Sequence, residues 1–225
     1  SEEGVTLERQ SLFIIKLRQT LLACDWAKAA TWAPLLKLLE SVDAQEHSAM
    51  PEFRAAVQEF DDMRTSTEAA AAAALRNGSA ERTADGSWSH KHIATAELAA
   101  ALVELEGFCK LSAAGTALAR EVAFVIQLRE AQLVCEWSRA ATWRGLADVL
   151  ASAECTSTVA AALSEVAELQ AARREFGEMR DATEAAVRAA MGQQRAVKTE
   201  SGQWSHAQLS VQGLTAALIE MEAFP

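Results

Sequence analysis

The chain has 225 residues, half of them hydrophobic, and a formal net charge of -10. The apolar content can fill a core and excludes a disordered chain, and the acidic balance argues against nucleic acid or an anionic membrane as the main partner. With three Pro, ten Gly and no Tyr, the composition predicts an all-α fold.

The sequence repeats internally. Shifting the chain by 111 residues aligns the first parts of two copies, a shift of 116 aligns their last parts, and an insertion of five residues lies between about 153 and 168. All six tryptophans fall into aligned pairs: Trp26 with Trp137, Trp32 with Trp143, and Trp88 with Trp204. We therefore predict two tandem antiparallel helical-bundle repeats of about 110 residues, 1–111 and 112–225, each with three to four helices.

The first segment of each copy, about 5–29 and 116–140, has an apolar stripe at helical spacing. In copy 1 the stripe consists of Phe13, Leu17 and Cys24, with Ile14 and Leu21 beside them. A stripe of this width is typical of a central helix, so we expect this helix to be mostly buried.

A helix break is predicted after the first segment, because Pro34 in copy 1 aligns with Gly145 in copy 2. Thr31 and Thr142 are candidate N-caps of a short second helix, with Pro34 in its first turn. A start at Asp25 and Glu136 is the alternative.

The third segment, about 51–76 and 158–191, is predicted to be a long helix of roughly 40 Å that forms the spine of the bundle. Its repeated seam is Phe60, Met63, Thr67, Ala70 and Ala74. A loop containing glycine then leads through Trp88 or Trp204 into a last helix, about 94–108 and 209–224, with Leu98, Leu102 and Leu105 facing inward.

His90 and His206 follow the loop tryptophan in both copies and are candidates for a metal or acid–base site. His92 adds a second imidazole in copy 1, but Gln208 takes its place in copy 2. Because a two-ligand motif that does not repeat lacks the usual metal-ligand set, we interpret these histidines as polar residues at a helix entry. No metal site is predicted.

The repeated carboxylates Glu104 with Glu106, and Glu220 with Glu222, lie about 200° apart on a helix, so a pair cannot readily share a substrate. We interpret them as a solvated face. Trp26 and Trp32 could line a ligand pocket or a groove for a partner helix, although core packing is the favoured interpretation. Since the chain has none of the common catalytic or phosphate-binding motifs, we predict no enzyme activity, catalytic residue or cofactor.

The four cysteines, Cys24, Cys109, Cys135 and Cys155, lack paired spacing. They predict buried, reduced thiols and a cytoplasmic or other reducing intracellular compartment. No stretch is long and apolar enough for a transmembrane span, so direct membrane insertion is not expected. Ser1 and Gly4 align with Ser112 and Gly115, so we expect the chain to be part of a longer array.

In its length near 110 residues and in the tryptophan on its first helix, the repeat is similar to spectrin-type repeats. It differs from their three-helix plan in the loop 86–90, in the additional last helix and in the glycine-containing joint 107–115. The likeness concerns length and helicity, and the family is not assigned.

The leading functional hypothesis is a non-enzymatic scaffold, spacer or protein-interaction platform within a larger protein, with neighbouring repeats and other proteins as partners. Positions that differ between the copies, such as Lys16 against Gln127 and Lys37 against Asp148, would then adjust partner binding. The alternative is a carrier of an apolar or pigment-like small molecule inside the bundles.

Overall fold

The computed structural model describes the whole chain except residues 1, 85, 156–165, 193–195 and 207–210. The described residues form nine α-helices, two short 3₁₀ helices and two hairpins of two-residue strands, so the predicted all-α class is confirmed. None of the described helices is long and apolar enough to cross a membrane.

The chain divides into two compact units, which are described separately. Unit 1 contains residues 1–77 and 94–124, and unit 2 contains residues 78–93 and 125–225. Most of the second sequence copy, residues 125–225, thus folds together with the hairpin segment 78–93 of the first. The predicted repeat boundary at 111/112 is a property of the sequence alignment and stays a prediction.

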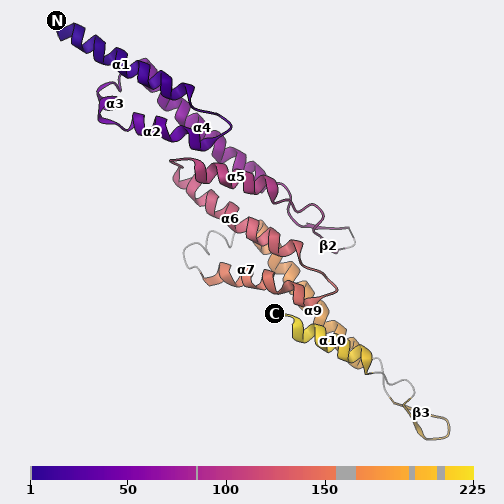
Figure 1. Cartoon of the computed structure of the whole chain (residues 1–225). Coiled ribbons are helices and arrows are strands. Elements are labelled where there is room, and N and C mark those ends of the chain that lie inside the picture. The colour runs from indigo at the N-terminus through magenta and orange to yellow at the C-terminus, as the bar shows by residue number, and fades with distance from the viewer. Residues whose placement is uncertain (1, 85, 156–165, 193–195, 207–210) are drawn as a thin grey trace. The chain divides into compact units, whose positions relative to one another are not determined.

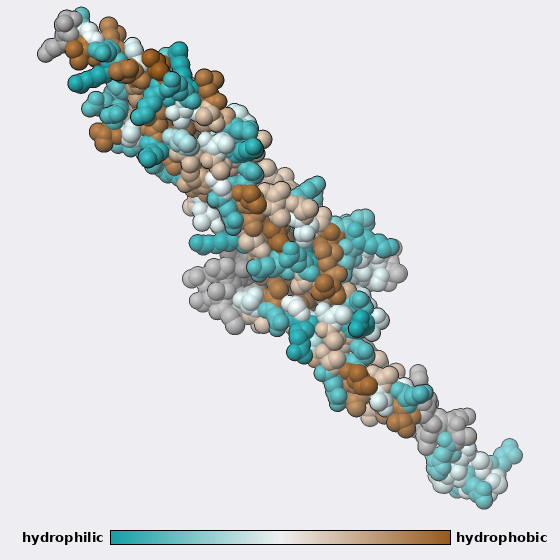
Figure 2. Space-filling model, in the orientation of Figure 1, coloured by the Kyte–Doolittle hydropathy of each residue, from teal (hydrophilic) through white to brown (hydrophobic). Residues whose placement is uncertain are grey.

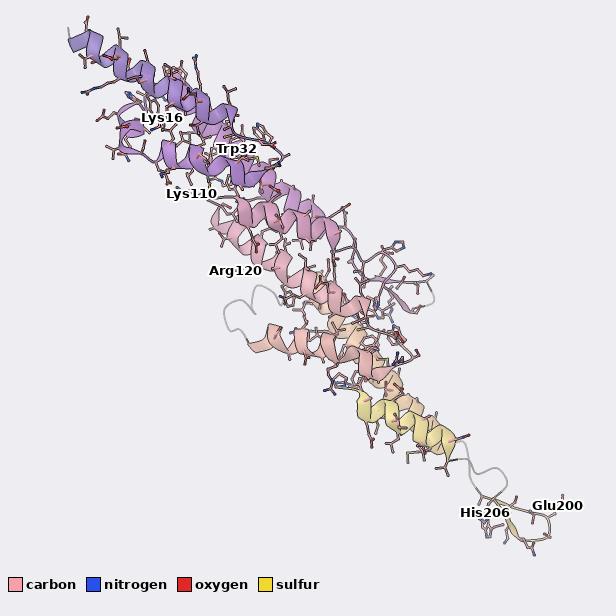
Figure 3. The ribbon with its side chains drawn as sticks, viewed as in Figure 1. Lys16, Trp32, Lys110, Arg120, Glu200 and His206 are labelled. Carbon is pink, nitrogen blue, oxygen red and sulfur yellow. The ribbon has the colours of Figure 1, made fainter. Side chains whose placement is uncertain are left out.

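Unit 1 is built on the contact between a long helix and the helix after the hairpin (Figure 1). Its elements are α1 (Glu2–Leu22), η1 (Ala29–Trp32), α2 (Ala33–Leu39), α3 (Val42–Glu46), α4 (Pro51–Leu75), α5 (Ala96–Gly107) and the first part of α6 (Ala113–Leu133). Phe13, Leu17, Leu35 and Phe60 belong to one hydrophobic core cluster with the fully buried Trp32, which Figure 3 labels. This core forms because α1, α2 and α4 each contribute one apolar side to it.

Unit 2 has a corresponding arrangement. Its elements are β1 (Glu81–Arg82), β2 (Trp88–Ser89), the rest of α6, η2 (Ala140–Trp143), α7 (Arg144–Cys155), α9 (Ala167–Gly192), β3 (Val197–Lys198), β4 (Trp204–Ser205) and α10 (Gln212–Ala223). Trp143, Leu146 and Leu169 are fully buried, and the Phe176 and Phe224 rings lie 4.9 Å apart. The long helix and the last helix again form the main packing pair.

The predicted N-cap role of Thr31 is wrong. Helix α1 ends at Leu22, and Thr31 lies inside η1, where its Oγ1 accepts from the Asp25 backbone N–H at 2.8 Å and donates to the Lys28 carbonyl at 2.7 Å. Trp32 Nε1 donates to the Asp25 carbonyl at 3.0 Å. A local hydrogen-bonded turn thus replaces the last turn of the helix, while Pro34 occupies the first turn of α2 as predicted.

The expected burial of the first helix is also wrong for α1. Phe13 and Leu17 are buried, but Ile14 and Leu21 are half-buried, and Leu7 and Ile15 are 63% and 52% exposed. The aligned helix α6 is buried more deeply, with Val122, Val125 and Leu128 fully inaccessible. Figure 2 shows apolar side chains on the molecular surface beside hydrophilic ones.

The predicted long helix exists in both copies, although its bounds differ. Helix α4 begins at Pro51 as expected, whereas Val166 is not helical and α9 begins at Ala167; the predicted stretch 158–165 lies outside the described residues. Phe60, Met63 and Thr67 are buried. Ala71 is buried and the predicted Ala70 is exposed, because the 3.6-residue period of the helix drifts away from a strict alternation of three and four residues.

The last helices differ in burial. Leu98 and Leu105 of α5 are buried and Leu102 is half-buried, as the prediction required. Helix α10 has no buried residue, and Met221, which aligns with Leu105, is 37% exposed. The aligned apolar positions of the two last helices are therefore buried or half-buried in α5 and more exposed in α10.

Candidate protein-interaction site

The segment predicted as a glycine-containing loop folds into the β1–β2 hairpin. Glu81 pairs with Ser89 and Arg82 with Trp88. The Gly86 N–H donates to the Thr83 carbonyl at 2.9 Å, and Gly86 has φ +85°, a conformation that glycine adopts without a Cβ penalty. The hairpin therefore holds Arg82 and Trp88 on neighbouring strands.

This hairpin contacts α9 through charged and polar groups. Trp88 Nε1 donates to Glu178 Oε2 at 2.9 Å, and an Arg82 guanidinium nitrogen lies 3.1 Å from the other oxygen of Glu178. His90 Nε2 lies 2.5 Å from Glu175 Oε1. Three side chains from one short segment thus bind two carboxylates one helical turn apart.

Glu175 is the most deeply buried of these groups. Its side chain is 0% exposed, and its second oxygen accepts from Gln132 Nε2 of α6 at 2.9 Å. A buried carboxylate is tolerated when hydrogen bonds satisfy both of its oxygens, as they do here. The hairpin residue His90 therefore completes a polar cluster with groups from two helices of unit 2.

A second buried charge lies on the same helices. Arg129 of α6 donates from Nε to Glu168 Oε2 at 3.0 Å and from a terminal nitrogen to Oε1 at 2.5 Å, a bidentate pair. The Arg129 side chain is fully buried. Ser79 and Ala80, just before β1, line a small pocket together with Glu168 and Gln132, so the hairpin segment lies against this region.

The aligned hairpin β3–β4 has the same local structure but different surroundings. The Gly202 N–H donates to the Thr199 carbonyl, and Gly202 has φ +81°. Trp204 is 63% exposed and His206 is exposed (Figure 3). Groups that bind α9 in the first hairpin therefore face solvent in the second.

The histidines do not form a metal centre in the described residues, where no three potential ligands gather. His90 lies six residues before α5 begins at Ala96, the N-cap of that helix is Thr95, and His90 contacts Glu175, which the helix-entry interpretation missed. His92 is exposed, and its counterpart Gln208 lies outside the described residues.

The interpretation of the repeated glutamates as a solvated face is wrong for one member of each pair. Glu104 Oε2 accepts from the Ala29 N–H at 2.6 Å, and Glu220 Oε2 accepts from the Ala140 N–H at 2.7 Å. A carboxylate at the start of a helix satisfies an otherwise unpaired N–H. Glu106 and Glu222 are exposed, as expected.

Matching shallow grooves lie beside the partly exposed tryptophans, and each has a volume of about 280 Å³. The groove in unit 1 is lined by Trp26, Met63 and Glu104, among others, and every lining residue has its aligned counterpart in the groove of unit 2. Trp32 does not line the groove. It is fully buried and packs edge-on against Trp26, with ring centroids 5.1 Å apart, so the core interpretation holds for Trp32.

The cysteines are less uniformly buried than predicted. Cys135 is buried, Cys24 is half-buried and Cys109 is exposed, and all three are free thiols; the Cys155 side chain lies outside the described residues. Burial raises the pKa of Cys135 to about 12, with a further contribution from the Glu175 charge. The Cys135 thiol therefore stays protonated and unreactive at neutral pH.

The sequence could have indicated part of this site. The spacing Thr-x-x-Gly-x-Trp occurs in both copies, at Thr83 and at Thr199, and is compatible with a three-residue hairpin loop. Nothing local indicated that His90 would contact a residue 85 positions later. The chain matches no known protein family, no curated protein and no solved structure.

Proposed function

We propose that this chain is a non-enzymatic module of two tandem helical-bundle repeats, which serves as a scaffold or spacer and as a protein-interaction platform within a larger protein. The observation that carries the proposal is the contact of Trp88 and His90 with Glu178 and Glu175. A segment that belongs by sequence to the first repeat thereby completes the polar interior of the second. A contact of this kind joins residues of both sequence copies within unit 2, as expected where neighbouring repeats depend on each other for stability.

The chemistry of the cluster supports a structural role more than a catalytic one. Both oxygens of Glu175 already have partners, and the His90 side chain is only 16% exposed, so a substrate has little access to either group. Catalytic groups usually face a cleft in which a reacting atom can sit.

Positions that differ between the repeats are available for partner binding. Lys16, Gln127, Lys37 and Asp148 are all exposed, and Figure 3 labels Lys16 on α1. The five-residue insertion between about 153 and 168 lies mostly outside the described residues. We propose a protein partner and a reducing intracellular compartment for the chain, with no nucleic-acid partner.

Removing the hairpin contacts is expected to destabilise unit 2. In the double variant Trp88→Ala/His90→Ala, the buried Glu175 loses a partner, and leaving a buried polar group unpaired costs about 1–3 kcal/mol and more when it is charged. We expect the free energy of unfolding, measured by urea titration with far-UV circular dichroism, to fall by about 2–3 kcal/mol.

The matched control is Trp204→Ala/His206→Ala, which changes the same residue types in the exposed hairpin. In dilute protein it is expected to unfold within about 0.5 kcal/mol of the wild type. Equal losses for the two double variants would show that the first hairpin does not hold the repeats together, and the proposed scaffold role would lose its basis.

The repeated groove beside Trp26 and Trp137 favours a second candidate, a carrier of an apolar small molecule. Its volume lies just below the usual range for small-molecule sites, and its lining combines an indole, a thioether, methyl groups, two hydroxyl-bearing residues and one carboxylate. Native mass spectrometry distinguishes the two functions. A scaffold gives the mass of the bare 24.2-kDa chain or a whole multiple of it, whereas a carrier retains extra mass on each chain that Trp26→Ala/Trp137→Ala removes.

A further inference from the structure

The structure contains a donor hairpin whose binding groups are exposed. Lys198, Trp204 and His206 align with Arg82, Trp88 and His90, the three residues through which the first hairpin binds α9. Trp204 is 63% exposed, and His206 has no hydrogen-bond partner among the described residues. The second hairpin therefore exposes the same kinds of side chain that bind α9 in the first hairpin, and here they bind no helix among the described residues.

Unit 1 contains the corresponding recipient face. Glu59 and Asp62 of α4 align with Glu175 and Glu178 of α9. Glu59 is half-buried and Asp62 is exposed, whereas Glu175 is fully buried under the first hairpin. The carboxylates that would receive a hairpin are thus in place and accessible.

The ion pair on this face shows the same difference. Arg18 and Glu52 align with Arg129 and Glu168, the buried bidentate pair of unit 2. In unit 1 the pair is 3.9 Å apart, with side chains 68% and 41% exposed. Unit 1 therefore has charged residues of the same sign at the aligned positions of this face, and no hairpin among the described residues covers them.

A second recipient region lies at the end of unit 2. In unit 1, Glu68 accepts from the Ser112 backbone N–H at 2.8 Å and from its hydroxyl at 2.9 Å, which fixes the start of α6. The aligned Glu184 instead pairs with Arg188 at 2.6 Å and lines an open pocket of about 410 Å³ with Met221 and Phe224. The segment that aligns with the start of α6 is the N-terminal segment 1–4.

We propose that separate molecules of this chain associate head to tail. The β3–β4 hairpin of one molecule binds the face formed by α1 and α4 of a second molecule. In this contact His206 lies against Glu59, and Trp204 and Lys198 lie against Asp62. Residues 2–4 of the second molecule, at the start of its α1, lie in the pocket beside Glu184 of the first. This inference rests on the proposed function, because it extends the hairpin contact within the chain to a contact between chains.

The contact between chains is expected to be weaker than the internal one. Leu21 aligns with Gln132, so Glu59 lacks the amide that binds Glu175, and Asp62 is one methylene shorter than Glu178. Because the two surfaces differ, the association is heterologous and leaves a free hairpin and a free recipient face on every assembly. The wild type should therefore form assemblies that grow with protein concentration.

Sedimentation velocity on the full chain tests the proposal with one variant for each surface. Trp204→Ala/His206→Ala removes the donor, and Glu59→Ala/Asp62→Ala removes the recipient. Each variant alone should sediment as a monomer at concentrations where the wild type associates. An equimolar mixture should give a 1:1 dimer and nothing larger, because it combines one intact donor with one intact recipient.

Three outcomes would overturn the inference: a wild type that is monomeric throughout, a recipient variant that still associates alone, or a mixture that stays monomeric. Circular dichroism confirms that each variant is folded, and the altered residues are exposed or half-buried. Failure of the association between molecules can be distinguished from failure of the proposed scaffold function. A monomeric wild type whose stability still depends on Trp88 and His90 refutes the association alone.

Discussion

Replacing Trp32 by alanine is expected to lower the free energy of unfolding of unit 1 by about 3–5 kcal/mol. The indole is fully buried in the core with Leu17, Leu35 and Phe60, and its N–H donates to the Asp25 carbonyl at 3.0 Å. The substitution leaves a large cavity and removes the hydrogen bond that closes the turn between α1 and η1. Urea unfolding followed by far-UV circular dichroism measures the loss.

Trp26→Ala is the matched control, because Trp26 is 54% exposed and contacts Trp32 only through an edge-on ring pair. Its expected cost is about 0.5–1.5 kcal/mol, the value of such a pair. If the two variants lose the same stability, Trp32 is not the centre of the unit 1 core.

Replacing Arg129 by methionine is expected to cost about 3–5 kcal/mol, because it leaves the Glu168 carboxylate without its partner. Methionine keeps most of the side-chain volume, so the loss reports on charge more than on packing. The aligned variant Arg18→Met removes an exposed pair at 3.9 Å and should cost less than about 1 kcal/mol.

The double variant Arg129→Met/Glu168→Met separates the two contributions to this cost. If the penalty comes from an unpaired buried charge, removing both charges should recover most of the stability lost in the single variant. A double variant as unstable as Arg129→Met would assign the loss to packing or to other contacts of Arg129.

Much of the helical framework could be predicted from sequence, because it depends on local patterns. The spacing of Phe60, Met63 and Thr67 determines one buried side of α4, and Pro34 marks the start of α2. Trp32 and Trp143, which align in the sequence, are both fully buried, and the indole N–H of each donates to the backbone carbonyl seven residues earlier.

The predictions failed where a residue's environment depends on a distant segment. Arg18 and Arg129 occupy the same sequence position, yet one side chain is 68% exposed and the other is fully buried. Likewise, Leu105 is buried while Met221 is 37% exposed. Helical periodicity identifies the side of a helix that can pack, but it contains no information about which element covers that side.

The hairpin 78–93 has a consequence for how such a chain could evolve. The stretch that repeats in the sequence is not the stretch that folds as a unit, because the first hairpin lies in the first sequence copy but belongs to unit 2 together with residues 125–225. A duplication of the whole 111-residue period would bring a new hairpin and a new recipient together at once. A recombination point between Asn77 and Gly78 would instead separate the first hairpin from the long helix that precedes it.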